Sequence, residues 1–356
     1  MTKKTSFILL VLLAAICLAC QPEPQSDEPA LGEDKFLPAP LFIDPNYHGS
    51  CDPEVVWNPH EEAWWIFYTA RKATDSNTWV GTPIGVASSK DMSEWKFRGY
   101  CRFDGVGGEP LAGETFWAPA IVAKGDSFHM FVTYKPDSLP TKNPWGDSPG
   151  QIVHYRAPVQ DLLNGWRRVG VIHDSALHTI DATVYAQADS LYVWFKGRHP
   201  GEKNELFQLV SQDMYQWQNR GFSQSDVFNE SVTGSGFEEA PYIFRWKDVY
   251  WLITDPHEGL FVYRSEDGQD WDFQGTILLE GSNRPLDNSR ARHCSVAVVD
   301  GRAILFYHVE PWREYGGRSV AKQPLENRRS VLQAAELRYE EGKISCDRGA
   351  EIAVPD

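Results

Sequence analysis

Three carboxylic acids open similar short phrases at well-separated places in the chain: Asp52, Asp181 and Glu239. Two more phrases of the same kind open on Trp117 and His293. Two carboxyl groups on either side of a glycosidic bond can hydrolyse it, because one donates a proton to the leaving oxygen while the other activates water or attacks the sugar carbon. A third acid can raise the pKa of the proton donor, and a Trp ring can pack on a sugar face. These residue types therefore indicate acetal hydrolysis, provided that the fold brings them together.

The phrases recur at intervals of 54 to 65 residues. Each is followed, after a short polar gap, by an apolar and aromatic run. The phrases are Asp52-Pro-Glu-Val-Val, Trp117-Ala-Pro-Ala-Ile, Asp181-Ala-Thr-Val-Tyr, Glu239-Ala-Pro-Tyr-Ile and His293-Cys-Ser-Val-Ala. Such a period indicates an array of similar units, and short β-rich units are typical of propeller blades. The sequence predicts an all-β fold, a five-bladed β-propeller, as a single domain over residues 41–356. The five opening residues are expected to be equivalent and to converge on one axis.

Each acid has a plainer explanation, in which it caps a strand or fixes a turn. For three acids in register this explanation is weaker, because carboxylates that converge on one axis repel each other and lose hydration. A fold with no use for them is expected to place small or apolar residues there. The arrangement therefore favours a site.

In their order and spacing, Asp52-Pro53, Trp117-Ala-Pro119, Asp181, Glu239-Ala-Pro241 and His293 resemble the five-bladed β-propeller glycosidases, above all glycoside hydrolase family 43. The resemblance implies that Asp52 is the general base, that Glu239 is the general acid, and that Asp181 tunes the pKa of the acid and orients the sugar. It also implies that His293 supports a central cation, often calcium, through water. No cofactor is required for the chemistry.

The chain departs from the family pattern at two places. The acid motif reads Glu-Ala-Pro instead of Glu-Gly-Pro, and Glu238 directly precedes Glu239. Neighbouring side chains of a strand point to opposite faces, so only one of these acids is expected in the site, and Glu239 is chosen. The phrase at His293 reads Arg-His-Cys-Ser where Gly-His is usual. A sister family of the same clan stays open.

Further residues are candidates for the substrate-binding mouth because they lie near these phrases. They are Phe116, Glu114, His178, Lys196 and Arg292, together with Trp117 itself. A strand end in solvent is an equal alternative for Lys196. Arginines near His293 are either solvated loop charges or a cationic patch for a carboxylate or sulfate on the substrate.

The resemblance implies an inverting, exo-acting glycosidase that cleaves arabinofuranosides, xylosides or similar terminal sugars from plant or algal polysaccharides or oligosaccharides. Two alternatives stay open. One is a carbohydrate-binding propeller without catalysis, and the other is a phosphorolytic glycosidase of similar fold. The expected partner is an oligosaccharide or polysaccharide, and the expected state is a monomer.

Composition excludes other classes. The chain has 356 residues, of which 42% are hydrophobic, and a formal net charge of −15. This hydrophobic content excludes wholesale disorder. An acidic surface disfavours nucleic acid and anionic membranes by repulsion.

The N-terminus predicts a bacterial lipoprotein signal over residues 1–20. Lys3 and Lys4 precede an apolar run that is short for a membrane span, and Leu18-Ala-Cys20 then resembles a lipoprotein cleavage site. Lipidation of Cys20 is expected to anchor an exported protein to the cell envelope, with residues 21–40 as a flexible tether. An ordinary secretory signal and an uncleaved anchor are the alternatives.

Four cysteines follow Cys20: Cys51, Cys101, Cys294 and Cys346. Export permits disulfides. Cys51 and Cys294 are expected on neighbouring blades, where a clasp between them and two buried free thiols are both open. The spacing of the four does not resemble a zinc site.

Overall fold

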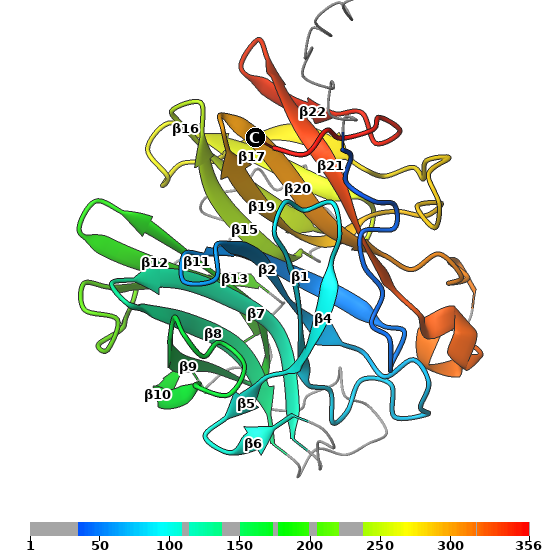
Figure 1. Ribbon diagram of the computed structural model, residues 1–356. Coiled ribbons are helices and arrows are strands. Elements are labelled where there is room, and N and C mark those ends of the chain that lie inside the picture. The colour runs from blue at the N-terminus through cyan, green and yellow to red at the C-terminus, as the bar shows by residue number, and fades with distance from the viewer. Residues whose placement is uncertain are drawn as a thin grey trace, which may run out of the picture. The chain divides into compact units, whose positions relative to one another are not determined.

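Five four-stranded antiparallel sheets make up the domain (Figure 1). The structure is a computed structural model. It describes residues 35–108, 114–136, 150–173, 177–198, 205–220, 238–317 and 319–355, and the side chains of residues 177 and 178 are not among them. Within these ranges helix is confined to two short 3₁₀ turns, Val320–Lys322 and Leu325–Arg328. The prediction of an all-β, five-bladed propeller is confirmed.

Each blade consists of consecutive strands, numbered from the inner strand outward. The first blade is β1 (Ser50–Asn58), β2 (Ala63–Ala70), β3 (Ile84–Ser89) and β4 (Lys96–Tyr100). The second is β7 (Thr115–Lys124), β8 (Ser127–Lys135), β9 (Gln151–Pro158) and β10 (Arg167–His173). The third is β11 (Leu177–Gln187), β12 (Ser190–Arg198), β13 (Glu205–Ser211) and β14 (Gln218–Asn219). The fourth is β15 (Glu239–Trp246), β16 (Val249–Asp255), β17 (Leu260–Ser265) and β18 (Asp272–Ile277). The fifth is β19 (Arg292–Val299), β20 (Arg302–Val309), β21 (Val331–Glu340) and β22 (Lys343–Cys346). A small hairpin, β5 (Arg102–Phe103) and β6 (Val106–Gly107), follows the first blade.

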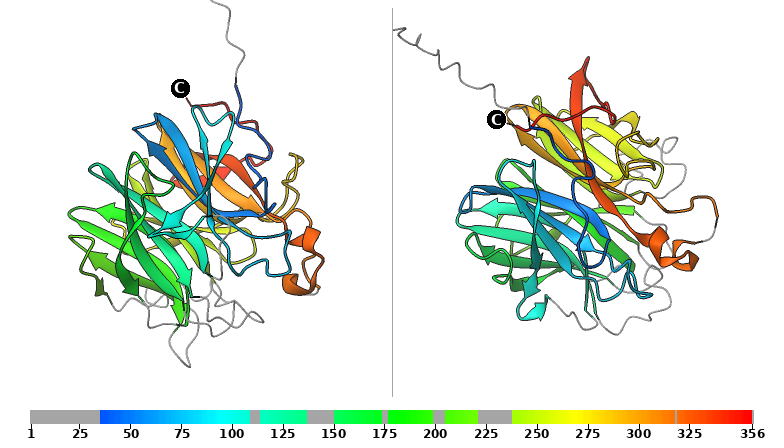
Figure 2. Two further views of the ribbon diagram at one scale, coloured as in Figure 1. Left: turned by 60° about the horizontal axis from the view of Figure 1, so that its bottom comes forward. Right: turned by 45° about the vertical axis from the view of Figure 1, so that its right-hand side comes forward.

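The inner strands form a closed ring (Figure 2). Each inner strand contacts the next: β1 contacts β7, β7 contacts β11, β11 contacts β15, and β15 contacts β19. The ring closes because β19 contacts β1. Hydrogen bonds to the fifth blade support this closure. Leu41, before β1, donates its N–H to Leu332 O at 2.8 Å, and Ser50, the first residue of β1, donates its N–H to Ser330 O at 3.1 Å. A closed ring leaves few free strand edges.

The hydrophobic core lies between the blades. Separate clusters of buried residues fill the spaces between neighbouring sheets, for example Trp194 of the third blade with Leu252 and Tyr263 of the fourth. Because the middle strands are covered on both faces, they are apolar almost throughout, as in Phe128 to Val132. This explains why the aromatic runs were the clearest repeat in the sequence.

A bulge interrupts every inner strand near its start. The bulged residue has a positive φ in each blade: Asp52 (52°), Ala118 (46°), Asp181 (59°), Ala240 (50°) and His293 (27°). A side chain pays roughly 1–2 kcal/mol in this conformation. Bulges of this kind redirect a side chain and often lie beside active sites.

These bulges correct the predicted equivalence of the five opening residues. Asp52, Asp181 and His293 are bulge residues, but Trp117 and Glu239 lie one position earlier, because the bulge residues of their blades are alanines. The pairing between the first and second strands of each blade leads to the same conclusion. In each blade, one residue of the inner strand pairs with the equivalent residue of the second strand. These pairs are Cys51 with Thr69, Trp117 with Thr133, Ile180 with Lys196, Glu239 with Asp255, and Arg292 with His308. Arg292, rather than His293, is thus the counterpart of Glu239.

The predicted tether reaches into the folded domain. Leu37 is buried and donates its N–H to Ile352 at 2.9 Å, and Phe36 forms a bridge with Ala353. Residues 35–40 therefore belong to the folded unit, which begins at Lys35. The predicted signal and Cys20 lie outside the described residues. Within the described part of the chain, no helix is long and apolar enough to cross a membrane.

The four described cysteines are free thiols, so the structure contains no clasp between Cys51 and Cys294. Cys51, Cys101 and Cys294 are buried. Burial raises the pKa of each of these thiols, so they are unreactive structural residues.

Candidate active site

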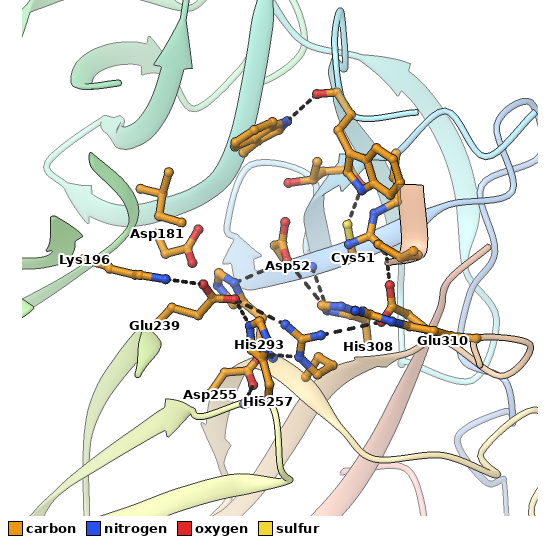
Figure 3. Close-up of a pocket in the computed structure, with 18 of the residues that line it drawn as sticks. Cys51, Asp52, Asp181, Lys196, Glu239, Asp255, His257, His293, His308 and Glu310 are labelled. Carbon is orange, nitrogen blue, oxygen red and sulfur yellow. Dashed lines mark hydrogen bonds and ion pairs between the residues drawn. The ribbon is translucent and has the colours of Figure 1, made fainter. Parts of the chain in front are cut away.

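A cavity of about 340 Å³ lies at the ends of the inner strands, and all five blades contribute to its wall. The side chains of Asp52, Trp117, Asp181, Glu239 and His293 all line it. Figure 3 shows the three acids and the histidine gathered around one space. The sequence therefore located residues that the fold brings together from distant parts of the chain.

The ends of the middle strands hold the bulges in place. In four blades the N–H of the bulge residue is bonded by a side chain from the middle strand of the preceding blade. The bonds are Ala118 to Thr69 Oγ1 (2.8 Å), Asp181 to Thr133 Oγ1 (3.0 Å), His293 to Asp255 Oδ2 (3.1 Å) and Asp52 to His308 Nδ1 (3.2 Å). In these four blades the bulge residue is thus held by two neighbouring blades.

Asp52 is an ionised acid that lines the cavity. Its Oδ1 lies 3.3 Å from His293 Nδ1 and 3.7 Å from His308 Nδ1. Burial raises the pKa of Asp52, but the charge and the hydrogen bond of His293 lower it more, so the pKa lies well below its usual value. His308 is buried, and burial lowers its pKa to about 3, so this imidazole is neutral.

Asp181 has the opposite character. Its side chain is buried, and burial raises its pKa to about 7; Glu239 and Asp52 also raise the pKa, while His293 and Lys196 lower it. A carboxyl group with this pKa carries a proton in a large fraction of molecules at neutral pH. Two acids of one cavity thus have widely separated pKa values, which is the arrangement that acid–base catalysis requires.

Glu239 lies among three basic side chains. Lys196 Nζ donates to its Oε2 at 2.7 Å, while Arg292 Nη2 at 3.2 Å and His257 Nε2 at 2.5 Å contact its Oε1. Burial raises the pKa of Glu239, but Lys196, His257 and Arg292 outweigh it and hold the pKa well below its usual value. The predicted proton donor is therefore ionised while the cavity holds no substrate.

Glu238 points away from the cavity. It is buried within the fourth blade, where it accepts hydrogen bonds from Thr254 Oγ1 at 2.5 Å and from Tyr263 Oη at 3.0 Å. Alternation along the strand thus separates it from Glu239, as expected.

His293 is charged at neutral pH. Burial lowers its pKa, but Asp52, Asp181 and Asp255 raise it to about 9. The imidazolium sits between Asp52 and Asp181 and favours the ionised form of both.

Trp117 has an indole ring that forms part of the wall. Its Nε1 donates to Trp79 O at 3.1 Å, and Lys135 Nζ lies 5.1 Å from the ring centroid. Lys135 is itself buried, and burial lowers its pKa to about 8. Lys196 and Arg292, which were predicted to bind substrate, also line the cavity.

Two predicted substrate-binding residues lie elsewhere. Phe116 is fully buried between the first two blades and packs on Phe103 with ring centroids 4.4 Å apart. It directly precedes Trp117 in β7, so its side chain points to the other face of the strand. Glu114 accepts a hydrogen bond from Tyr134 and does not line the cavity. The prediction for Phe116 is wrong, because proximity in sequence ignored this alternation, whereas the role of Glu114 stays a prediction. The side chain of His178 lies outside the described residues.

Sequence reasoning missed several cavity residues. They are Arg71, Trp79, Lys135, Asp255, His257 and Glu310. Arg313, one of the arginines near His293 that were considered as a cationic patch, also lines the cavity. A signal existed for Asp255, because Thr69, Thr133, Lys196, Asp255 and His308 occupy the same position of the five aromatic runs. Lys135 is the last residue of β8, and the others lie just beyond strand ends or in loops, where the repeat gives no register.

One group of possible ligands in the cavity does not suit a metal ion. Glu239, Asp255 and His257 offer ligand atoms within 4.8 Å of one another. However, Arg292 already bonds both carboxylates and Lys196 bonds Glu239, so protein cations neutralise this group. Calcium supported by His293 through water, which the resemblance implied, stays a prediction.

Comparison with known proteins agrees with this geometry. A sequence model for glycosyl hydrolases family 43 matches residues 73–328. No curated protein sequence matches the chain.

Solved structures share the fold. A thermostable family-43 glycoside hydrolase is 17% identical with a TM-score of 0.63, and the match covers 86% of this chain and 96% of that one. A β-xylosidase/α-arabinofuranosidase from a compost microbial metagenome, in complex with xylotriose and in a calcium-free form, is 14% identical with a TM-score of 0.58, covering 87% and 98%. An exo-1,5-α-L-arabinanase from a bovine ruminal metagenomic library is 14% identical with a TM-score of 0.55, covering 86% and 99%.

Proposed function

Because the chain belongs to glycosyl hydrolase family 43, and is therefore a glycoside hydrolase, we propose that this cavity releases terminal sugars from oligosaccharides or polysaccharides with inversion at the anomeric carbon. The observation that carries the proposal is the contrast between its acids. Asp52 is ionised beside a charged histidine, whereas Asp181 holds a proton near neutral pH. The cavity therefore contains both a carboxylate that can accept a proton and a carboxyl group that holds one.

Asp52 is the proposed general base. Water that attacks the anomeric carbon gives its proton to this carboxylate, and the bond between that carbon and the glycosidic oxygen breaks as the new C–O bond forms. Inversion requires the base and the acid to lie roughly 6.5–9.5 Å apart, so that water fits between the base and the sugar. This separation stays a prediction for Asp52 and Glu239.

Glu239 is the proposed general acid, although it is ionised in the substrate-free cavity. Its low pKa depends on Lys196, His257 and Arg292. When sugar hydroxyl groups accept hydrogen bonds from Lys196 and Arg292, the effect of burial on Glu239 is less opposed, and its pKa rises. The carboxyl group can then take up a proton and donate it to the leaving oxygen.

Asp181 is the proposed source of the site's proton and a guide for the sugar. It interacts electrostatically with Glu239, and each group lowers the acidity of the other when charged. A proton held on Asp181 in the free protein thus becomes available to the pair when substrate binds.

The pH dependence of kcat/KM is expected to report the protonation of Asp181. The free protein must carry a proton on this carboxyl group, so kcat/KM should fall as pH rises through about 7, the pKa of Asp181. On the acid side Asp52 stays ionised well below its ordinary pKa and should not limit activity near pH 5. Profiles on an aryl glycoside should show that Asp181→Asn abolishes the fall near neutrality. An increase of kcat/KM through pH 7, or an unchanged fall in the variant, would contradict this role.

Arabinofuranosides, xylosides or similar sugars are the proposed substrates. Structural neighbours named for xylosidase, arabinofuranosidase and exo-arabinanase activity support this class. The cavity, about 340 Å³, is at the small end of ligand pockets, which supports binding of a chain end over a long internal stretch.

A panel of defined oligosaccharides and aryl glycosides, followed by proton NMR of the first product, tests the proposal. The expected result is release of one sugar at a time with the opposite anomeric configuration. Retention would refute the inverting mechanism. Absence of turnover on the whole panel, with binding retained, would instead favour a carbohydrate-binding propeller.

Export and lipidation at Cys20 are proposed from the N-terminal sequence. In bacterial cells the full-length chain should be found in the membrane fraction, and Cys20→Ser should release it from the membrane, because the acyl anchor is lost. Cys346→Ser, at a thiol outside the signal, is the matched control. Equal distribution of the two variants would argue against a lipid anchor.

A further inference from the structure

Three arginines surround one buried carboxylate in the cavity wall. Arg71 and Arg313 each donate through Nη1 to Glu310, and Arg292 Nη1 lies 3.6 Å from it. The Glu310 side chain is 1% exposed. In Figure 3 Glu310 lies across the labelled cluster from Lys196 and Asp181. Glu310 is thus the carboxylate that Arg71 and Arg313 share, whereas Arg292 also pairs with Asp255 and Glu239.

The donors of these guanidinium groups are used unequally. Each has five N–H donors on Nε, Nη1 and Nη2. Arg292 uses all three nitrogens, with Asp255, Glu239 and Glu310. Arg71 and Arg313 use only Nη1, and within the described ranges their Nε and Nη2 atoms have no hydrogen-bond partner. Two forks of N–H donors therefore remain for a ligand.

These two arginines are largely withdrawn from solvent. Their side chains are only 11% and 21% exposed, for Arg71 and Arg313 respectively. Poorly hydrated charges are costly unless they are paired, and guanidinium edges match the oxygens of a carboxylate or sulfate. The wall of the cavity is therefore suited to an oxyanion.

The cavity as a whole has a positive bias. Its wall carries five Lys or Arg side chains and five Asp or Glu side chains. Asp181 has a pKa of about 7, so this acid is only partly ionised at neutral pH. His293 has a pKa of about 9, so its imidazolium adds a further positive charge. The sign is opposite to that of the chain, whose formal net charge is −15.

We propose that the terminal sugar bound here carries an anionic substituent, a carboxylate or a sulfate, which Arg71 and Arg313 recognise. The proposal rests on the glycosidase function above and, among the similar terminal sugars named there, selects acidic ones over neutral pentosides. An oxyanion attached to the sugar suits the geometry better than free phosphate acting as nucleophile. Such a phosphate must reach the anomeric carbon from the side of Asp52, whose carboxylate is ionised and repels it.

Matched ligands test the proposal on the unmodified protein. Binding is measured by calorimetry, in which glucuronate, galacturonate and galactose sulfate are compared with glucose and galactose. Hydrolysis is measured as an initial rate, in which nitrophenyl glucuronides and galacturonides are compared with nitrophenyl glucosides and galactosides. We expect at least one acidic member to bind about tenfold to hundredfold more tightly than its neutral partner, in line with hydrogen bonds to charged groups, and to be hydrolysed faster. Equal or stronger binding of the neutral partners throughout would overturn the proposal.

Variants locate the effect. Arg71→Met and Arg313→Met should remove most of the preference for the acidic ligand over its neutral partner. Arg338→Met, at an exposed side chain 3.9 Å from Asp347, is the matched control. If either cavity variant fails to fold, Arg71→Lys and Arg313→Lys keep the charge but not the fork and should give an intermediate loss. An unchanged preference in folded Arg71 and Arg313 variants would overturn the assignment.

The outcomes separate this inference from the function on which it rests. Hydrolysis of neutral sugars alone retains the glycosidase and overturns the anionic substrate. Turnover that requires inorganic phosphate and yields a sugar phosphate would assign the two arginines to phosphate, and would also overturn the proposal. Tight binding of acidic sugars without hydrolysis of any glycoside would sustain the subsite and refute the proposed reaction.

Discussion

Glu239→Gln is expected to slow hydrolysis of alkyl glycosides and natural linkages by about 10²–10⁴-fold, the usual contribution of a general acid. The amide cannot donate an acidic proton to the departing oxygen. An aryl glycoside whose phenol is a strong acid needs little protonation, so its hydrolysis should be slowed far less. The measurement is kcat/KM for a series of leaving groups of graded acidity, in which the variant should depend on leaving-group acidity much more steeply than the wild type.

Glu238→Gln is the matched control for this experiment. The two glutamates are adjacent, but Glu238 bonds Thr254 and Tyr263 inside the blade. Its replacement should lower the unfolding temperature and leave the leaving-group dependence unchanged.

The same series decides between two acids. In the substrate-free protein Asp181, with a pKa of about 7, holds the proton more readily than Glu239. If Asp181→Asn, and not Glu239→Gln, shows the steep dependence, then Asp181 is the proton donor and the proposed roles of the two are reversed. The leaving-group test is therefore more informative than loss of activity alone, which both variants should show.

The fold could be predicted from the sequence because the blade is a repeated unit. Middle strands are buried on both faces, so runs such as Trp64 to Tyr68 must be apolar in every blade. The ring then brings residues near the start of each inner strand to one cavity. Asp52, Asp181 and Glu239 could be found in this way, because only the period was needed.

The register at the bulges could not be predicted in the same way. A bulge places two residues opposite one, so a repeat in sequence does not say which of the two is equivalent. Trp117 and Glu239 were aligned with Asp52 for this reason, although Ala118 and Ala240 hold the bulge position. The shift matters for function, since it makes Arg292 the structural counterpart of the proposed acid and brings it into contact with Glu239 at 3.2 Å.

Charge relations were also beyond the sequence. The pKa of Glu239 depends on Lys196 of the preceding blade, His257 of a loop and Arg292 of the following blade. These three residues belong to separate parts of the chain, and no spacing rule joins them. The same holds for Arg71 and Glu310, which are 239 positions apart.

Asp52→Asn is expected to reduce kcat by about 10²–10⁴-fold for good and poor leaving groups alike, since a general base acts on water and not on the departing oxygen. The amide has no free carboxylate to accept the proton of the attacking water. His293 should change with it, because Asp52 is the largest of the groups that raise the pKa of this imidazole to about 9. NMR of the histidine ring should show that pKa falling in the variant.

Asp52→Ala adds a chemical readout. Removal of the side chain opens space beside the anomeric carbon and leaves the other cations of the cavity in place, so a small anion such as azide should enter and attack the sugar directly. Azide should accelerate Asp52→Ala, leave the wild type unchanged, and give a glycosyl azide with inverted configuration, detectable by NMR. Asp300→Asn is the matched control, since Asp300 is exposed in a turn with a φ of 51° that asparagine also adopts. An Asp52→Asn variant with near-normal kcat, or a retained configuration in the azide product, would show that Asp52 does not act as the base on the attacking face.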